Sequence, residues 1–138
     1  MSGTILIADD HPLFRQALTL AAQDVVPDAR LVEAANLPSA LAEAVAADDL
    51  ALILLDLRMP GADGYSGVAL LHAEKPGVPI LVVSSAQGAD AARNALRFGA
   101  VGFLSKDATL DAIEDGIRDA LAGVRMAPPR DDVIDPVA

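Results

Sequence analysis

Short apolar segments with the character of β-strands alternate with segments of helical periodicity five times along this chain of 138 residues. The central apolar segment, Leu50–Asp56, has no polar side chain before its last residue, which is typical of a strand covered by helices on both faces. In an alternating pattern of this kind the crossovers are right-handed and the strands run parallel. We therefore predict one α/β domain, a doubly wound parallel sheet with helices on both of its faces.

The boundaries of the expected elements follow from the apolar patterns and from the Gly and Pro residues between them. The strands are predicted at Thr4–Asp9, Ala29–Ala34, Leu50–Asp56, Ile80–Ser84 and Gly102–Leu104. The helices are predicted at Pro12–Asp24, Leu37–Ala47, from the Gly64–Gly67 stretch to Glu74, at Ala89–Phe98 and from the N-cap Thr109 to Gly123. Gly99 is expected to adopt a left-handed cap, and the last helix is expected to present Leu110, Ile113, Ile117 and Leu121 on one face.

Polar side chains stand at the ends of four of the predicted strands. Asp9 and Asp10 close the first strand, Asp56 closes the third, Ser84 closes the fourth and Lys106 follows the fifth. Because the carboxyl ends of parallel strands meet at one edge of a sheet, these side chains are expected to converge. Carboxylate oxygens suit Mg²⁺, and a carboxylate can also act as a nucleophile. The sequence therefore predicts a magnesium site, a nucleophile and a charge clamp at this edge.

Each of these residues also has an ordinary structural role. An aspartate at a strand end is commonly a cap or turn former, and adjacent aspartates suit the N-terminus of a helix. Ser85 competes with Ser84 for the hydroxyl role. His11 is a candidate metal ligand or proton shuttle, but because Mg²⁺ is the expected ion we favour a surface role for its ring.

Composition excludes several classes of site and partner. The chain has no cysteine, so disulfides and thiolate metal sites are ruled out, and two histidines are too few for a typical zinc site on their own. Its formal net charge of −10 argues against nucleic-acid binding by this chain alone. No apolar run approaches the ~18 residues that span a bilayer. We therefore expect a soluble cytoplasmic protein without membrane contact.

Four motifs in register resemble the receiver domains of two-component response regulators. They are Ile5–Arg15 (ILIADDHPLFR), Asp56–Gly61 (DLRMPG) followed by Asp63-Gly64, the hydroxyl at Ser84, and Gly99–Lys106 (GAVGFLSK). The resemblance covers about Thr4 to Gly123. The His11-Pro12 dipeptide, the absence of Pro after Lys106 and the exit from Gly123 to Pro129 are similar to the NarL/FixJ-type subgroup.

The resemblance implies a flavodoxin-like strand order, 2-1-3-4-5, and a phosphorylation site. Asp56 would accept a phosphoryl group from a sensor histidine kinase or a phosphotransfer protein. The implied ion is Mg²⁺, with Mn²⁺ as an alternative. Asp10 and Asp56 would bind it directly, Asp9 through water, and the backbone carbonyl of Arg58 would be the third protein ligand.

The same resemblance implies how the signal would leave the site. Lys106 would pair with one phosphoryl oxygen and the Ser84 hydroxyl would donate to another. Phe103 would act as a switch that swings inward with Ser84. The surface formed by the fourth helix, fifth strand and fifth helix would then change, and a homodimer would form on phosphorylation.

The resemblance also divides the chain into residues 1–125, the receiver domain, and residues 126–138, a linker or disordered tail. Met126–Ala138 carries three Pro, three Asp and no periodicity. We expect this to be the receiver part of a longer transcription regulator, in which a C-terminal helix-turn-helix domain supplies the only contact with DNA. The rivals are a stand-alone or non-phosphorylated receiver acting as an interaction module, a Mg²⁺-dependent phosphotransferase and a flavin-binding electron carrier. A phosphotransferase would lack room for its substrate among the short loops of this chain. A flavin-binding carrier would lack a phosphate loop after the first strand.

Overall fold

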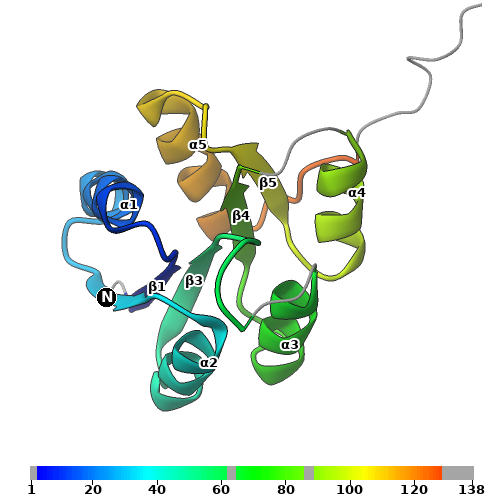
Figure 1. The fold of residues 1–138 in the computed structure, drawn as a ribbon. Helices are drawn as coiled ribbons and strands as arrows, with labels where there is room; N and C mark the ends of the chain where they lie inside the picture. Colours follow the sequence, from blue (N-terminus) through cyan, green and yellow to red (C-terminus); the bar gives the residue numbers. More distant parts are fainter. Residues whose placement is uncertain (1–2, 62–64, 86–88, 129–138) are drawn as a thin grey trace, which may run out of the picture.

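The computed structural model describes residues 3–61, 65–85 and 89–128. Its centre is a five-stranded parallel sheet in the order β2-β1-β3-β4-β5 (Figure 1), which confirms the predicted topology. The strands are β1 (Thr4–Ala8), β2 (Arg30–Ala34), β3 (Leu50–Leu55), β4 (Ile80–Ser84) and β5 (Gly102–Ser105).

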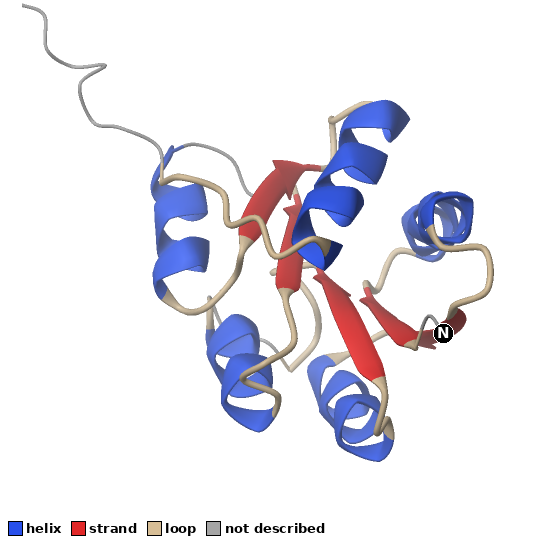
Figure 2. Cartoon of the chain, turned by 180° about the vertical axis from the view of Figure 1, so that it is seen from behind, coloured by secondary structure: helices blue, strands red, loops and turns tan. Residues whose placement is uncertain are grey.

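Helices cover both faces of the sheet, so the structure has three layers (Figures 1 and 2). Helices α1 and α5 pack over one face, and α2, α3 and α4 pack over the other. The helices are α1 (Pro12–Val25), α2 (Leu37–Ala46), α3 (Ser66–Glu74), α4 (Ala89–Arg97) and α5 (Leu110–Leu121). No helix in the described part of the chain has the length and apolar character that a membrane span requires.

The central strands divide their side chains between two cores. On β3, Leu52 and Leu54 pack beneath α1 and α5, whereas Ile53 and Leu55 pack beneath the other three helices. Successive strand residues point to opposite faces, and so a strand buried on both sides must be apolar throughout. Full burial of each such Leu or Ile contributes about 1.5–3 kcal/mol to folding.

Two strands end one residue earlier than predicted, and both differences concern aspartates of the expected site. Strand β1 ends at Ala8 and β3 at Leu55. The backbone amides of the next residues still bond to the sheet, because Asp9 N donates to Ala34 O at 3.0 Å and Asp56 N donates to Ala8 O at 2.9 Å. The sheet therefore fixes the backbone beneath both carboxylates.

The last helix confirms the predicted caps but only part of the predicted face. Thr109 Oγ1 accepts a hydrogen bond from Ala112 N at 3.1 Å, and Gly123 follows the helix with a φ of 82°. Ile113 and Ile117 are buried as expected. Leu110 and Leu121 are 52% and 36% exposed because they occupy the two ends of the helix, where the neighbouring elements cover less of it.

Glycine is required where the loop after β3 meets α2. Gly61 has a φ of 86°, and a Cβ there would lie 2.7 Å from Pro38 Cδ. Next to it, Leu37 N donates to Pro60 O at 2.9 Å. The loop is thus anchored on the first turn of α2. Gly99 likewise has a positive φ, 126°, as its predicted left-handed cap requires. The predicted Asp63-Gly64 motif and the chain beyond Pro128 lie outside the described residues.

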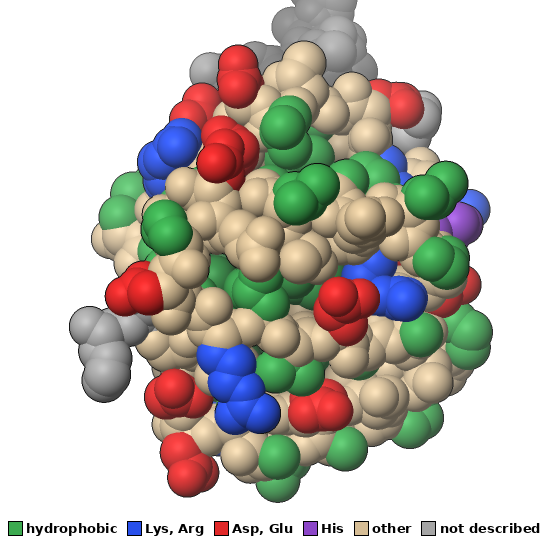
Figure 3. Space-filling model, turned by 90° about the vertical axis from the view of Figure 1, so that its left-hand side faces the viewer, with side chains coloured by type: hydrophobic (Ala, Val, Ile, Leu, Met, Phe, Trp, Pro, Cys, Tyr) green, Lys and Arg blue, Asp and Glu red, His purple; other side chains and the backbone are tan. Residues whose placement is uncertain are grey.

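The surface carries charges of both signs. On the face shown in Figure 3, Asp and Glu side chains are spread among Lys and Arg side chains instead of gathering in one acidic patch. The net charge of −10 is therefore not concentrated in one acidic patch on this face.

Candidate functional site

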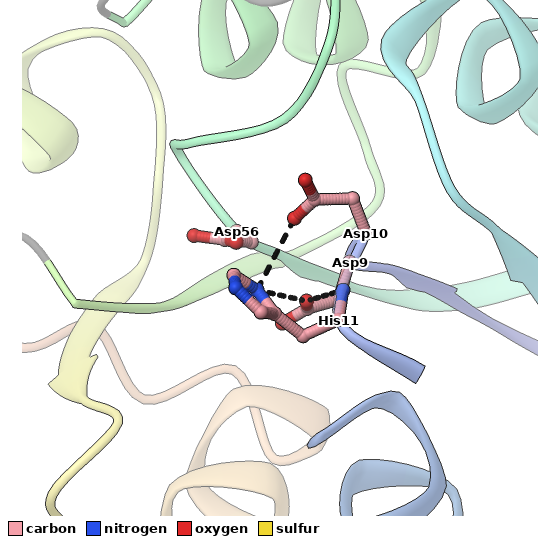
Figure 4. A group of neighbouring side chains, drawn as sticks. All are labelled: Asp9, Asp10, His11 and Asp56. Carbon is pink, nitrogen blue, oxygen red and sulfur yellow. Dashed lines mark hydrogen bonds and ion pairs between the residues drawn. The ribbon is translucent and has the colours of Figure 1, made fainter. Parts of the chain in front are cut away.

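The polar residues at the strand ends do converge at one edge of the sheet. Asp9 and Asp10 follow β1, Asp56 follows β3, Ser84 is the last residue of β4 and Lys106 follows β5. Figure 4 shows the three carboxylates together with the ring of His11. Residues up to 97 positions apart in sequence are in hydrogen-bond contact here.

Asp56 is almost fully buried, at 1% exposure. Its Oδ1 accepts hydrogen bonds from Ser84 Oγ at 3.0 Å and from Arg58 N at 3.1 Å. Its Oδ2 lies 3.2 Å from Lys106 Nζ. Both carboxylate oxygens are therefore held by donors, which fixes the orientation of the group. Ser85, the rival hydroxyl, is exposed.

Lys106 provides the positive charge that links two of the aspartates. Its Nζ lies 3.0 Å from Asp9 Oδ2 and 3.2 Å from Asp56 Oδ2, with the side chain only 14% exposed. The same ammonium lies 4.7 Å from the ring centroid of Phe14, a cation–π contact that further restricts its position. One ammonium is shared by two buried carboxylates and cannot neutralise both.

Two carboxylate oxygens at the site are buried and accept no hydrogen bond. They are Asp9 Oδ2 and Asp10 Oδ1. Lys106 Nζ lies 3.0 Å from Asp9 Oδ2 but outside hydrogen-bonding geometry, and it donates instead to Asp9 Oδ1 at 3.3 Å. Buried polar atoms are nearly always hydrogen-bonded, so such a pair is typical of a place where a ligand completes the set.

A divalent cation fits this set of donors. One ligand atom each from Asp9, Asp10, His11 and Asp56 can be chosen so that all lie within 4.8 Å of one another. Carboxylate oxygens are the protein ligands that Mg²⁺ prefers, and the ion usually keeps several waters as well. Three carboxylates facing a single ammonium leave the negative charge that such an ion would neutralise.

Two further predicted residues lie in different surroundings. Arg58 is exposed and reaches the site through its backbone amide. Phe103 lies on β5, partly buried against the core beneath α2, α3 and α4. Phe103 comes three residues before Lys106 in the sequence, and its role as a switch stays a prediction.

Three residues after Asp10 also shape the site, and two of them, Phe14 and Arg15, were not predicted from the sequence. The His11 ring, a candidate ligand in the sequence, lies beside the carboxylates, and its side chain is 64% exposed, which also agrees with the expected surface position. Phe14 supports Lys106, and Arg15 Nη1 donates to Asp9 O at 2.8 Å while its Nε donates to Glu33 Oε1. All three lie in the segment that follows Asp10, and their closeness in sequence to the aspartates was the one available signal.

Comparison with known proteins decides the family. Residues 5–118 match the family of the response regulator receiver domain. This chain belongs to that family. Receiver domains are the switches of two-component signalling, so the sheet, the acidic edge and the lysine form the expected parts of one known kind of domain.

Individual relatives agree with the assignment. The chain is 43% identical to the glycerol metabolism activator of Pseudomonas putida over 91% of this chain and 57% of that protein. It is 39% identical to protein-glutamate methylesterase/protein-glutamine glutaminase 2 of Anaeromyxobacter dehalogenans over 88% of this chain and 37% of that protein. The solved signal receiver domain of the putative response regulator NarL from Mycobacterium tuberculosis superimposes with a TM-score of 0.75 at 32% identity, covering 88% of this chain and 98% of that domain. This receiver thus spans between about a third and three fifths of the two longer proteins.

Proposed function

We propose that this receiver is a phosphoryl-accepting switch with Asp56 as the acceptor. The observation that carries the proposal is the setting of that carboxylate. It is buried at the end of the central strand, with Ser84 and Lys106 on its two oxygens and two aspartates beside it. Phosphoryl transfer needs an in-line nucleophile and neutralisation of the phosphoryl oxygens, and this edge of the sheet offers both.

The donor is a phosphohistidine of a sensor histidine kinase or a phosphotransfer protein. An Asp56 oxygen attacks the phosphorus, the new P–O bond forms as the P–N bond breaks, and the imidazole leaves with the bonding electron pair. Mg²⁺, or Mn²⁺ in its place, would supply positive charge to neutralise the transferred group. Asp10, Asp56 and the Arg58 backbone carbonyl would hold the ion directly and Asp9 through water.

The chain's own residues then carry the signal. Lys106 leaves its carboxylate partners and pairs with a phosphoryl oxygen. The Ser84 hydroxyl leaves Asp56 Oδ1 and donates to a second phosphoryl oxygen. Phe103 follows into the space that Ser84 vacates, which alters the surface of α4, β5 and α5. The chemistry is limited to the receiver's own phosphorylation and dephosphorylation, so the protein acts as a switch and turns over no separate substrate.

We assign the switch to a cytoplasmic transcription regulator that dimerises on phosphorylation. The curated relative with 43% identity is named an activator, which supports this role. The net charge of −10 supports a division of labour, in which a domain outside residues 1–125 contacts DNA. Gel retardation by this chain alone would contradict that division.

Labelling tests the acceptor. Incubation with Mg²⁺ and acetyl phosphate should give one acid-labile phosphoryl adduct by intact mass. Asp56→Asn should abolish the adduct, whereas Asp107→Asn, which changes an exposed carboxylate next to Lys106, should retain it. An adduct on Asp56→Asn at unchanged stoichiometry would place the acceptor elsewhere.

A further inference from the structure

We propose that His11 Nδ1 is a ligand of the cation and makes this site favour Co²⁺, Ni²⁺ and Zn²⁺ over Mg²⁺. The inference rests on the cation site proposed above and adds a nitrogen donor to its oxygen ligands. Imidazole suits these later first-row ions, whereas Mg²⁺ binds oxygen ligands almost exclusively. One side chain would therefore set which metals the receiver takes up.

The local backbone holds the His11 ring beside the carboxylates. His11 N donates to Asp9 Oδ1 at 2.8 Å, which curls the chain over the Asp9 side chain. Pro12 follows, and a residue before proline is restricted to extended conformations. His11 has that conformation, with φ −96° and ψ 108°. It is the N-cap of α1, yet its side chain makes no capping hydrogen bond. The ring is thus held at the site without a role in capping the helix.

The distances suit ligands of one ion. His11 Nδ1 lies 3.3 Å from Asp10 Oδ1 and 3.4 Å from Asp9 Oδ1. Neighbouring ligands of an octahedral ion at about 2.1 Å lie about 3.0 Å apart, so a small side-chain rotation brings His11 Nδ1 and Asp10 Oδ1 into a common shell. Asp10 Oδ1, which faces the ring, is one of the two buried oxygens that accept no hydrogen bond.

Lys106 contacts the same ring nitrogen from within the site. Its Nζ lies 3.1 Å from His11 Nδ1. An ammonium has only hydrogens to offer, so this contact suits the tautomer in which Nδ1 presents its lone pair and Nε2 carries the ring proton. The same lone pair is what a metal ion needs. Binding of the ion at Nδ1 would displace the ammonium and release Lys106 towards the phosphoryl group.

The alternative is a surface histidine that only shields the site, and the 64% exposure of the His11 side chain suits both readings. Calorimetric titration with Co²⁺ and Mg²⁺ at matched ionic strength separates them. His11→Ala should weaken Co²⁺ binding at least about tenfold and change Mg²⁺ binding less than about twofold. His72→Gln, which alters the other histidine of the chain, should change neither. An unchanged ratio of Co²⁺ to Mg²⁺ affinity in His11→Ala would overturn the inference.

Proton NMR of the Co²⁺-loaded protein gives a second readout, which does not depend on measured affinities. A paramagnetically shifted, solvent-exchangeable imidazole N–H signal is expected from a ligating ring. Its absence in the wild type, or its persistence in His11→Ala, would contradict ligation by His11. Failure of the cation site itself looks different, because then neither ion would bind and acetyl phosphate would label no residue. Labelling of Asp56 and Mg²⁺ binding with no effect of His11 would defeat this inference alone.

Discussion

Asp56 shows how a single residue can be stable and reactive in one place. Its carboxylate is buried, and burial of a charged group is costly unless donors surround it. Ser84 Oγ, Arg58 N and Lys106 Nζ supply those donors from three separate segments. Two of them, Ser84 and Lys106, are side chains that can turn from the carboxylate to a phosphoryl oxygen. The contacts that stabilise the resting state are therefore available to the phosphorylated state.

The Ser84 hydroxyl is expected to trigger the conformational response. Ser84→Ala removes the 3.0 Å bond to Asp56 Oδ1, but Arg58 N remains as a donor, so the cost should be about 1–2 kcal/mol of stability. The variant should still be labelled by acetyl phosphate, because the acceptor and Lys106 are intact. Hydrogen exchange of α4 and β5 should change much less on labelling than in the wild type. Ser85→Ala removes an exposed hydroxyl one residue away and should respond like the wild type. A response lost in Ser85→Ala and kept in Ser84→Ala would assign the trigger to Ser85.

The convergence of the site residues could be predicted because it depends only on the fold. In a parallel sheet the residues at the carboxyl ends of the strands lie along one edge, so the strand boundaries alone predict which residues meet there. Asp9, Asp56 and Lys106 do lie together at that edge. The place of the His11 ring could not be predicted in this way. It depends on the turn after β1, on the bond to Asp9 Oδ1 and on a rotamer, none of which leaves a periodic signal in the sequence.

At the scale of elements, the packing of α5 against α1 brings two carboxyl groups together. Glu114 of α5 is largely buried, and a hydrogen bond with Asp24 of α1, followed by burial and the negative charge of Asp24, raises its pKa above the ordinary value of 4.5. Asp111 raises the pKa further, whereas Arg118, whose Nη2 lies 3.8 Å from Glu114 Oε1, lowers it. The packing of α5 on α1 therefore favours the protonated form of Glu114 in the folded protein.

The sign of the pH dependence follows from that raised pKa. Above pH 4.5 an unfolded Glu114 loses its proton while the folded protein still holds it, so this stabilisation weakens as pH rises through the folded pKa. Glu114→Gln stays neutral and should make unfolding in urea harder at pH 7 relative to the wild type than at pH 5. Glu43→Gln, an exposed change on α2, should show no such difference. A Glu114→Gln effect of equal size at both pH values would contradict a raised pKa of Glu114 in the folded protein.

The order of the elements and the helix caps could be predicted from the sequence, whereas the extent of the buried face of α5 could not. Thr109 and Gly123 act locally, so their positions alone indicated where α5 begins and ends. The exposure of Leu110 and Leu121 depends instead on how far the neighbouring helix and sheet extend. That distance is a property of tertiary packing, which the helical period does not contain.

For the whole molecule, the main electrostatic fact is a concentration of like charge at one edge of the sheet. The chain carries a net charge of −10, and three of its carboxylates meet around one lysine. Spread-out surface charges are screened by ordinary salt, whereas a cluster with two buried carboxylates is screened much less. The two contributions can therefore be separated by comparing a binding ion with a merely screening one.

Mg²⁺ should stabilise the folded chain more than NaCl does at the same ionic strength. An ion that binds the native cluster and not the unfolded chain adds about 1.4 kcal/mol at ten times its dissociation constant, which is a rise of a few degrees in melting temperature. Asp10→Asn should remove most of this difference, because Asp10 Oδ1 is one of the oxygens that no hydrogen bond satisfies. Asp48→Asn removes the same charge from an exposed position between α2 and β3 and should leave the response to Mg²⁺ intact. Equal shifts of the melting temperature with Mg²⁺ and Na⁺ in the wild type would contradict metal binding. The repulsion between the carboxylates would then be reduced by Lys106 and by salt screening alone.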